Sequence, residues 1–379
     1  MTIIDRYILR SFLKSFCLWF ICFIGIYIVF DLFTKMDSFL KAGGGVLGAV
    51  VLICKFYAIQ SLPFFNMISP ILCLTSAMFT IGMLIRHNEL TPILAAGISR
   101  ERVIKPIIFA VVILTGCTAI CRETLLPMFM DDLMKDPAKF VSHDGSDLYA
   151  ATDYNSGFML LGNKVFYKER EITEPNISFL DKSLSVHGKK LNAKEAVYYP
   201  AKDGKPSGFL MKDVMSPQEI LRGPSLALDG RPIVITPKDA DWLESGDCFV
   251  VSKIPFAYIA SNESWRENAS TWEYISAIRG QSLDIGVDIE SKIHARILQP
   301  FLDMTLFFLG IPIILTRGGE RNVFKAMGLV ALIVFSFLVV QYGALFFGRN
   351  SEMPVLGAWF PIIVFIPIAI YLYRKMADS

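Results

Sequence analysis

Six long apolar runs constrain the fold of this chain more than any other feature of its sequence. Each is long enough to cross the hydrocarbon core of a bilayer, which takes about 20 helical residues. Hydrophobic residues make up 53% of the chain and charged residues only 19%, which excludes an ordinary soluble protein. We therefore predict a polytopic α-helical membrane protein with six transmembrane helices. The runs occupy residues 12–33, 46–85, 103–127, 293–315, 323–347 and 353–373.

The first two runs leave alternatives open. Residues 1–14 place apolar and basic side chains near helical spacing, which fits an amphipathic interfacial helix or the charged flank of the first span. The run at 46–85 is longer than one crossing needs, and Lys55, Pro63 and Pro70 interrupt it. Either its first part lies outside the hydrocarbon or the helix is kinked and tilted.

The polar middle of the chain has a different periodicity. Short stretches alternate apolar and polar side chains with the period of two that is typical of β-strands. Asp203-Gly204 and Asp229-Gly230 are turn signals between such strands. We predict an all-β domain of the jelly-roll or sandwich type, with flanking helices. The alternating stretches are residues 157–169, 194–214, 226–237 and 247–259. The predicted domains are residues 1–127, 128–288 and 289–379.

The distribution of Lys and Arg between the short loops predicts the orientation, because cytoplasmic loops carry the excess of these residues. One set of loops carries Arg6, Arg10, Lys14, Arg86, Arg100, Arg102, Lys105, Arg317, Arg321, Lys325, Arg374 and Lys375. The opposite set carries Lys35, Lys41, Lys55 and Arg349. We predict that both termini and residues 86–105 are cytoplasmic and that the β domain lies outside.

Motifs of catalysis and cofactor binding are missing from the sequence. There is no G-x-x-x-x-G-K-[ST] phosphate loop, no G-x-S-x-G elbow and no H-E-x-x-H motif. Of the seven cysteines, only Cys248 lies in the polar middle, and no CxxC spacing occurs. We expect no enzyme activity, no cofactor, no metal and no nucleic-acid partner.

Charged residues at membrane depth indicate a function or a partner, because their burial is costly. Four cations fall at the outer ends of the first three spans, where they are candidate ligands for an anionic lipid headgroup. The alternative is that these side chains extend to the interface. The four are Lys35, Lys41, Lys55 and Arg122. Gln299 and Asp303, near Pro300, mark a face turned toward protein or water rather than lipid.

Residues 86–105 form a polar interruption that contains a short helical pattern. Asn88 is a suitable cap, Glu89 suits the positive end of a helix, and Gly97 suits a left-handed C-terminal position. Leu90, Ile93 and Leu94 would then form an apolar ridge that faces the cytoplasm and enters a groove on a partner. The alternative is a connecting loop that lies against its own bundle.

Several motifs together resemble the lipopolysaccharide export permeases of the LptF/LptG family. Asn88-Glu89-Leu90 followed by residues 95–99 (AAGIS) is similar to the family's E-L-…-A-x-G-[IFL]-[ST] signature. The resemblance covers essentially the whole chain, including the three-plus-three layout around a β domain. The other matching residues are Asp5, Arg6, Tyr7, Asp37, Lys41, Ala42, Gly43, Glu290, Arg296, Pro300, Ala358 and Trp359.

The resemblance implies a half-transporter of the inner membrane whose jelly-roll domain is periplasmic. Its implied partners are a cytoplasmic ABC ATPase dimer, a sister permease subunit, a periplasmic bridge protein and lipopolysaccharide. The implied ATPase-coupling segment contains Glu89, Leu90, Ile93, Leu94 and Gly97.

Some positions depart from the family pattern. Thr34, Leu40 and Phe64 stand where related G-type subunits place further cations, so the headgroup sites rest on position rather than on a motif. The residues after the first span favour the G type. The function predicted is therefore a permease subunit that exports lipopolysaccharide or lipooligosaccharide. The alternatives are an envelope scaffold and an exporter of another amphiphile.

Overall fold

The computed structural model describes residues 3–43, 45–133, 145–167, 169–202, 205–283, 287–317, 323–350 and 353–378. The chain divides into two compact units. The first, here called the bundle unit, contains Met1–Asp37, Tyr57–Leu125 and Val287–Ser379. The second, the sheet unit, contains Ser38–Phe56 and Leu126–Gly286. The turn signal predicted at residues 203–204 lies outside the described residues. So does the loop cation Arg321.

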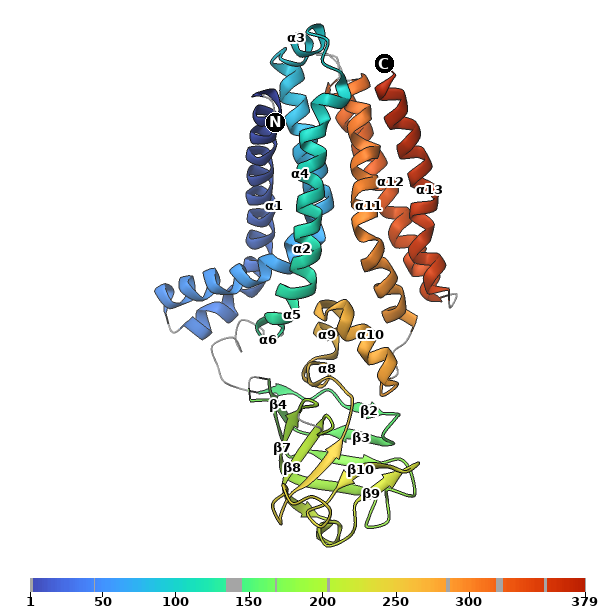
Figure 1. Ribbon diagram of the computed structural model, residues 1–379. Helices are drawn as coiled ribbons and strands as arrows, with labels where there is room; N and C mark the ends of the chain where they lie inside the picture. The colour runs from blue at the N-terminus through green and yellow to red at the C-terminus, as the bar shows by residue number, and fades with distance from the viewer. Residues whose placement is uncertain are drawn as a thin grey trace. The chain divides into compact units, whose positions relative to one another are not determined.

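Within the part of the chain that the structure describes, six helices are long and apolar enough to cross a membrane. This confirms the predicted number of spans. They are α1 (Ile3–Gly43), α2 (Val46–Arg86), α4 (Arg100–Ile120) with its π-helical continuation η1 (Cys121–Leu125), α11 (Val287–Arg317), α12 (Val323–Asn350) and α13 (Pro354–Ala377). The short helix α3 (Leu90–Ala95) joins α2 to α4. Figure 1 shows α11, α12 and α13 running side by side.

The helix α1 contains the first basic residues and the first apolar run without a break. Its 41 residues begin at Ile3, so residues 3–14 are its first turns and form no separate helix. Ile8 and Phe12 in these turns are fully buried. This agrees with a flank that belongs to the first span, rather than with an independent interfacial helix.

The core of the bundle unit joins both sets of spans. Ile81 from α2 and Ile107 from α4 belong to one apolar cluster with Leu306 and Ile314 from α11. All four side chains are at most 1% exposed. Asp303 on α11 is also buried, and its carboxylate accepts a hydrogen bond of 2.7 Å from the Gln299 amide. The polar face predicted on this helix is therefore turned toward protein.

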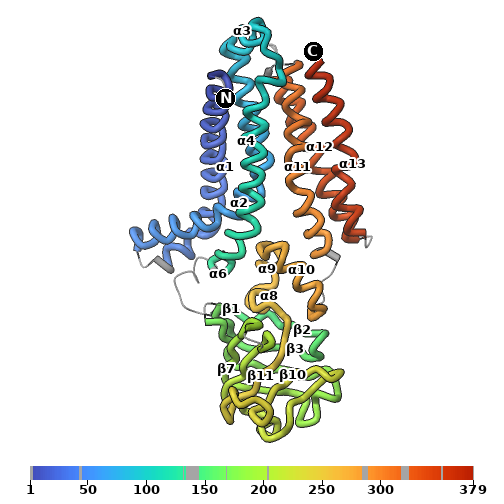
Figure 2. The backbone as a smooth tube through the Cα atoms, viewed as in Figure 1, coloured from blue at the N-terminus to red at the C-terminus, as the bar shows by residue number. Residues whose placement is uncertain are grey.

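The sheet unit contains one open antiparallel sheet of 11 strands, which confirms the predicted all-β, jelly-roll-like domain. The order along the main path is β1-β4-β5-β7-β8-β11-β10-β9. The long strand β7 pairs with β8 along one edge, while β6 and β5 share its other edge. Figure 2 traces these strands as a smooth tube. The strands are β1 (Ser146–Asp147), β2 (Ala151–Asp153), β3 (Phe158–Leu161), β4 (Lys164–Phe166), β5 (Glu171–Thr173), β6 (Asn176–Phe179), β7 (Lys190–Tyr199), β8 (Gly208–Ser216), β9 (Leu226–Leu228), β10 (Arg231–Ile235) and β11 (Cys248–Val251).

Short helices flank the strands. The predicted turn between β9 and β10 is confirmed, because Asp229 and Gly230 have φ values of 50° and 77° that the mirror-image hairpin turn requires. The predicted strand after β11 is wrong. Residues 256–260 form a helix with every side chain buried, so they have no alternating face. The helices of this unit are α5 (Leu126–Met128), α6 (Met130–Leu133), η2 (Gln218–Leu221), α8 (Phe256–Ala260), α9 (Asn262–Asn268) and α10 (Thr271–Gly280).

Candidate functional site

The segment between α2 and α4 begins with a left-handed residue that ends α2. Asn88 has a φ of 59°, and its amide donates to the Ile85 carbonyl at 3.0 Å. The Glu89 amide donates to the Leu84 carbonyl at 2.9 Å, which completes a Schellman motif. The prediction that Asn88 caps α3 is therefore wrong. Glu89 is the residue that caps α3, and it makes no side-chain cap hydrogen bond.

A second Schellman motif ends α3 at the predicted glycine. Gly97 has a φ of 81°, a conformation that glycine adopts without strain. Its amide donates to the Leu94 carbonyl at 3.0 Å, and the Ile98 amide donates to the Ile93 carbonyl at 3.3 Å. Both motifs together fix the entry and the exit of α3. The path of a six-residue helix, which would not be stable alone, is thereby defined.

The apolar ridge of α3 faces the bundle rather than the solvent. Leu90 is only 7% exposed and belongs to the bundle core, while Ile93 and Leu94 are half-buried against it. This corrects the predicted direction of the ridge. The physical reason is that apolar side chains at the ends of α2 and α4 lie in the same cluster as α3 and bury its ridge. The exposed surface of α3 consists instead of Thr91, Pro92, Ala95 and Ala96.

The first turn of α1 contacts both ends of this segment. The Tyr7 hydroxyl donates to Oε2 of Glu89 at 2.8 Å, across 82 residues of sequence. Oδ2 of Asp5 lies 3.8 Å from Nη2 of Arg102, in the first turn of α4. No periodicity signals either contact, because the partners come from separate helices.

The candidate headgroup cations differ in exposure and in the unit of the chain to which they belong. Nζ of Lys35 lies 3.0 Å from the Asp31 carboxylate, which also accepts a 2.8 Å hydrogen bond from the Tyr57 hydroxyl. Lys41 and Lys55 are both exposed and belong to the sheet unit. Lys35 and Arg122 belong to the bundle unit. Lys35 is thus neutralised in part by its own helix.

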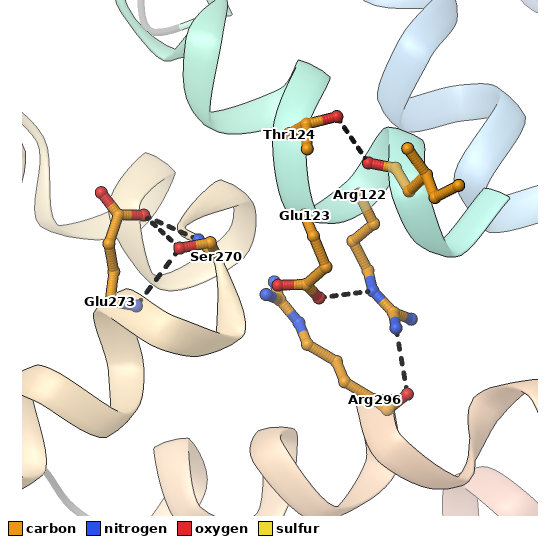
Figure 3. A network of polar contacts seen from close by, with 7 residues as sticks. Arg122, Glu123, Thr124, Ser270, Glu273 and Arg296 are labelled. Carbon is orange, nitrogen blue, oxygen red and sulfur yellow. Dashed lines mark hydrogen bonds and ion pairs between the residues drawn. The ribbon is translucent and has the colours of Figure 1, made fainter. Parts of the chain in front are cut away.

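Arg122 lies on the π-helical segment η1, a feature that is frequent at functional sites. Its Nη2 donates to the Arg296 carbonyl at 3.0 Å, and its Nε lies 3.4 Å from Oε1 of Glu123 (Figure 3). The Arg296 carbonyl is available because Pro300, four residues later, has no N–H with which to close the helical hydrogen bond. The Arg122 guanidinium therefore replaces the backbone partner that the proline removes.

This arrangement predicts a stability effect at Arg122. Arg122→Met keeps an unbranched side chain but removes this donor from the Arg296 carbonyl, which costs about 1 kcal/mol in a part-buried setting. We expect a lower apparent melting temperature of the detergent-purified chain. Arg349→Met is the matched control, because Arg349 is an exposed cation on α12. Equal melting temperatures for the two variants would show that the guanidinium is not the partner of this carbonyl.

Comparison with known proteins identifies the family of the chain. A family model described as lipopolysaccharide export system permease LptF/LptG matches residues 6–135 and 200–375, which are most of the chain. No match was found among curated proteins. Permeases of this family are the membrane components of an ABC transport system and are not themselves enzymes. The chain therefore belongs to the LptF/LptG family of lipopolysaccharide export permeases, and with its six apolar helices it is a multi-pass protein of the inner membrane.

Proposed function

We propose that this chain is the permease subunit through which a separate cytoplasmic ATPase drives lipopolysaccharide or lipooligosaccharide out of the inner membrane. In this proposal both termini are cytoplasmic and the β domain, residues 128–288, is periplasmic. The chain pairs with a sister permease, and its β domain passes the lipid to a periplasmic bridge protein. The residues that follow the first span, Asp37 and Lys41 to Gly43, support assignment to the G type.

The observation that carries the proposal is the construction of α3. A helix too short to stand alone is held between two Schellman motifs and anchored by Leu90 in the bundle core. Its outer surface is left exposed, with only small side chains and a proline, at the end of the bundle where Lys and Arg gather. Such a rigid, shallow surface suits insertion into a groove of a partner protein. We assign Thr91, Pro92, Ala95 and Ala96 as the surface that docks on the ATPase, and Glu89, Leu90, Ile93, Leu94 and Gly97 as the residues that shape and hold it.

The lipid headgroup is assigned to the cations at the other end of the first three spans. Exposure supports Lys41 and Lys55 as direct ligands of a phosphate. Lys35 and Arg122 have a weaker claim than Lys41, because an Asp31 carboxylate and the Arg296 carbonyl already engage them. Lys35 and Arg122 remain candidate headgroup cations within the bundle unit.

Purification of the chain together with its co-expressed sister subunit and ATPase tests the function. We expect the ATPase in stoichiometric amount, and mass spectrometry is expected to find a lipid A-bearing lipid. Absence of the ATPase would support an envelope scaffold instead. A different bound lipid would identify an exporter of another amphiphile.

Charge reversal at Lys41 tests the headgroup site in the same preparation. Lys41→Glu replaces attraction to a phosphate by repulsion, and we expect bound lipid to fall about fivefold, the equivalent of about 1 kcal/mol. The matched control is Lys182→Glu, which reverses an exposed charge in the loop after β6. An equal lipid content in both variants would remove Lys41 from the site.

A further inference from the structure

We propose that the first turn of α1 is a brace for α3, in which Tyr7 and Asp5 are positioning residues that make α1 follow any movement of α3. The inference rests on the proposed function, because it assigns the route by which movement of the ATPase-docking segment enters the spans. It adds a role for side chains that neither dock on the ATPase nor bind lipid.

Two polar contacts hold opposite ends of the α3 segment to one turn of α1. The Tyr7–Glu89 hydrogen bond of 2.8 Å lies where the chain enters α3. The Asp5–Arg102 contact of 3.8 Å lies beyond its exit, and the Asp5 side chain is only 15% exposed. The Tyr7 contact is a short hydrogen bond to a carboxylate, whereas the 3.8 Å separation of Asp5 and Arg102 is beyond hydrogen-bond range, so the contact of Tyr7 is the stronger of the two. One turn of α1 thus spans the whole α3 segment.

Apolar contacts complete the brace. A cavity lies on each side of these contacts between α1 and α3. Ile8 is fully buried in the cluster that contains Leu90, and Ile4 packs against the same cluster. A cavity of about 380 Å³ is lined by Tyr7, Lys14, His87 and Glu89 among others. A second, of about 450 Å³, is lined by Ile4, Asp5, Gly97, Ile98, Ser99, Arg102 and Val103. Because open space flanks the turn, the two polar contacts and the two isoleucines hold α3 against α1.

Beyond the brace, α1 contacts α2 at several points between Ser15 and Asp31. The fastenings are the Thr80–Ser15 hydrogen bond of 3.1 Å, the Trp19–Phe79, Phe20–Phe65 and Tyr27–Phe64 ring contacts, and the Tyr57–Asp31 hydrogen bond of 2.8 Å. The last of these adjoins Lys35, which pairs with Asp31. A displacement of α3 that reaches the first turn of α1 is therefore delivered to the end of α1 that carries a proposed headgroup cation.

Hydrogen–deuterium exchange of the full-length chain in detergent, without the ATPase, tests the brace directly. Tyr7→Phe removes the hydroxyl and keeps the ring. We expect the amides of residues 90–98 to exchange about threefold to fivefold faster, as the loss of one solvent-exposed hydrogen bond predicts. Asp5→Asn is expected to have a smaller effect, because Arg102 is 53% exposed and exposed ion pairs contribute little. Tyr371→Phe, which removes an exposed hydroxyl from α13, is the matched control and should change nothing.

The assembled transporter supplies a measurement that a merely structural contact would not move. We expect Tyr7→Phe to retain the ATPase on purification but to release about half as much lipid, or less, per ATP hydrolysed. Unchanged exchange at residues 90–98 would overturn the brace even if the ATPase co-purifies. Faster exchange with an unchanged lipid yield per ATP would overturn the positioning role. If the unmodified chain fails to retain the ATPase, the proposed function fails, and the exchange measurement still decides whether the brace exists.

Discussion

Leu94→Asp is expected to abolish lipid-stimulated ATP hydrolysis and to remove the ATPase from the purified transporter. Leu94 packs against the bundle core, and a carboxylate there loses its water without gaining a partner. The charged side chain leaves the core and takes the C-terminal half of α3 with it. Because six residues do not hold a helix by themselves, the exposed docking surface loses its shape. We expect stimulated hydrolysis to fall at least tenfold, toward the level of the ATPase alone, as measured in proteoliposomes.

Leu94→Met is the matched control for this prediction. Methionine keeps the apolar character and nearly the volume of leucine, so α3 stays anchored and hydrolysis is expected to change less than twofold. Ala95→Asp offers a second comparison. Because Ala95 is exposed, this substitution adds a charge to the docking surface and none to the bundle core. Retention of the ATPase by Leu94→Asp, with full stimulated hydrolysis, would show that α3 is not the coupling segment.

The six spans and the all-β domain follow from local patterns, which is why the sequence predicts them. A run of 20 or more apolar residues forms a helix in a bilayer whatever its neighbours are, since its backbone must satisfy its own hydrogen bonds there. The hairpin of β9 and β10 is equally local, because Asp229-Gly230 suits only a few turn types. Residues 256–260 do not follow a local pattern. Their apolar side chains follow a strand-like stretch, and only burial on every side makes them a helix.

Within the α3 segment, the glycine was predictable and the direction of the ridge was not. A glycine after a short helical pattern is a strong local signal for a left-handed position, and Gly97 occupies one. Asn88 has the same conformational preference, yet it serves the end of α2 rather than the start of α3. Which way Leu90 and Leu94 face depends on what lies beside α3, and the single sequence does not contain that information.

The contact of Arg122 has a local clue in the sequence, which is Pro300 within a helix. In a continuous helix, Pro300 has no N–H to donate to the Arg296 carbonyl. That carbonyl therefore needs a donor from elsewhere. The sequence does not say which of its many donors supplies the hydrogen bond. Tyr7 and Glu89 have no such clue, because neither residue needs the other for its helix to form. Contacts between helices far apart in sequence are therefore what the structure adds.

Close packing of glycines on α12 and α13 predicts the largest effect on stability. A Cβ atom added at Gly357 would lie 2.6 Å from the Ala344 carbonyl oxygen and 2.9 Å from Cα of Gly348. Both neighbours are backbone atoms of α12, so neither can move without shifting the whole helix. Small residues at such crossings let helix backbones approach within a membrane, where packing holds helices together. We expect Gly357→Ala to separate α12 from α13, at a cost of about 1–3 kcal/mol, and to lower the apparent melting temperature of the detergent-purified chain.

Gly343→Ala on α12 makes this prediction specific, because its expected effect has the opposite sign. A Cβ at Gly343 meets no atom within 4 Å, so the substitution only improves helix propensity, by about 0.8–1 kcal/mol in a helix interior. Both variants add one methyl group to a helical glycine, and they differ only in what that group meets. A melting temperature that falls for Gly357→Ala and holds or rises for Gly343→Ala confirms the contact between backbones. If Gly357→Ala melts with or above the unmodified chain, α12 and α13 do not cross at these glycines.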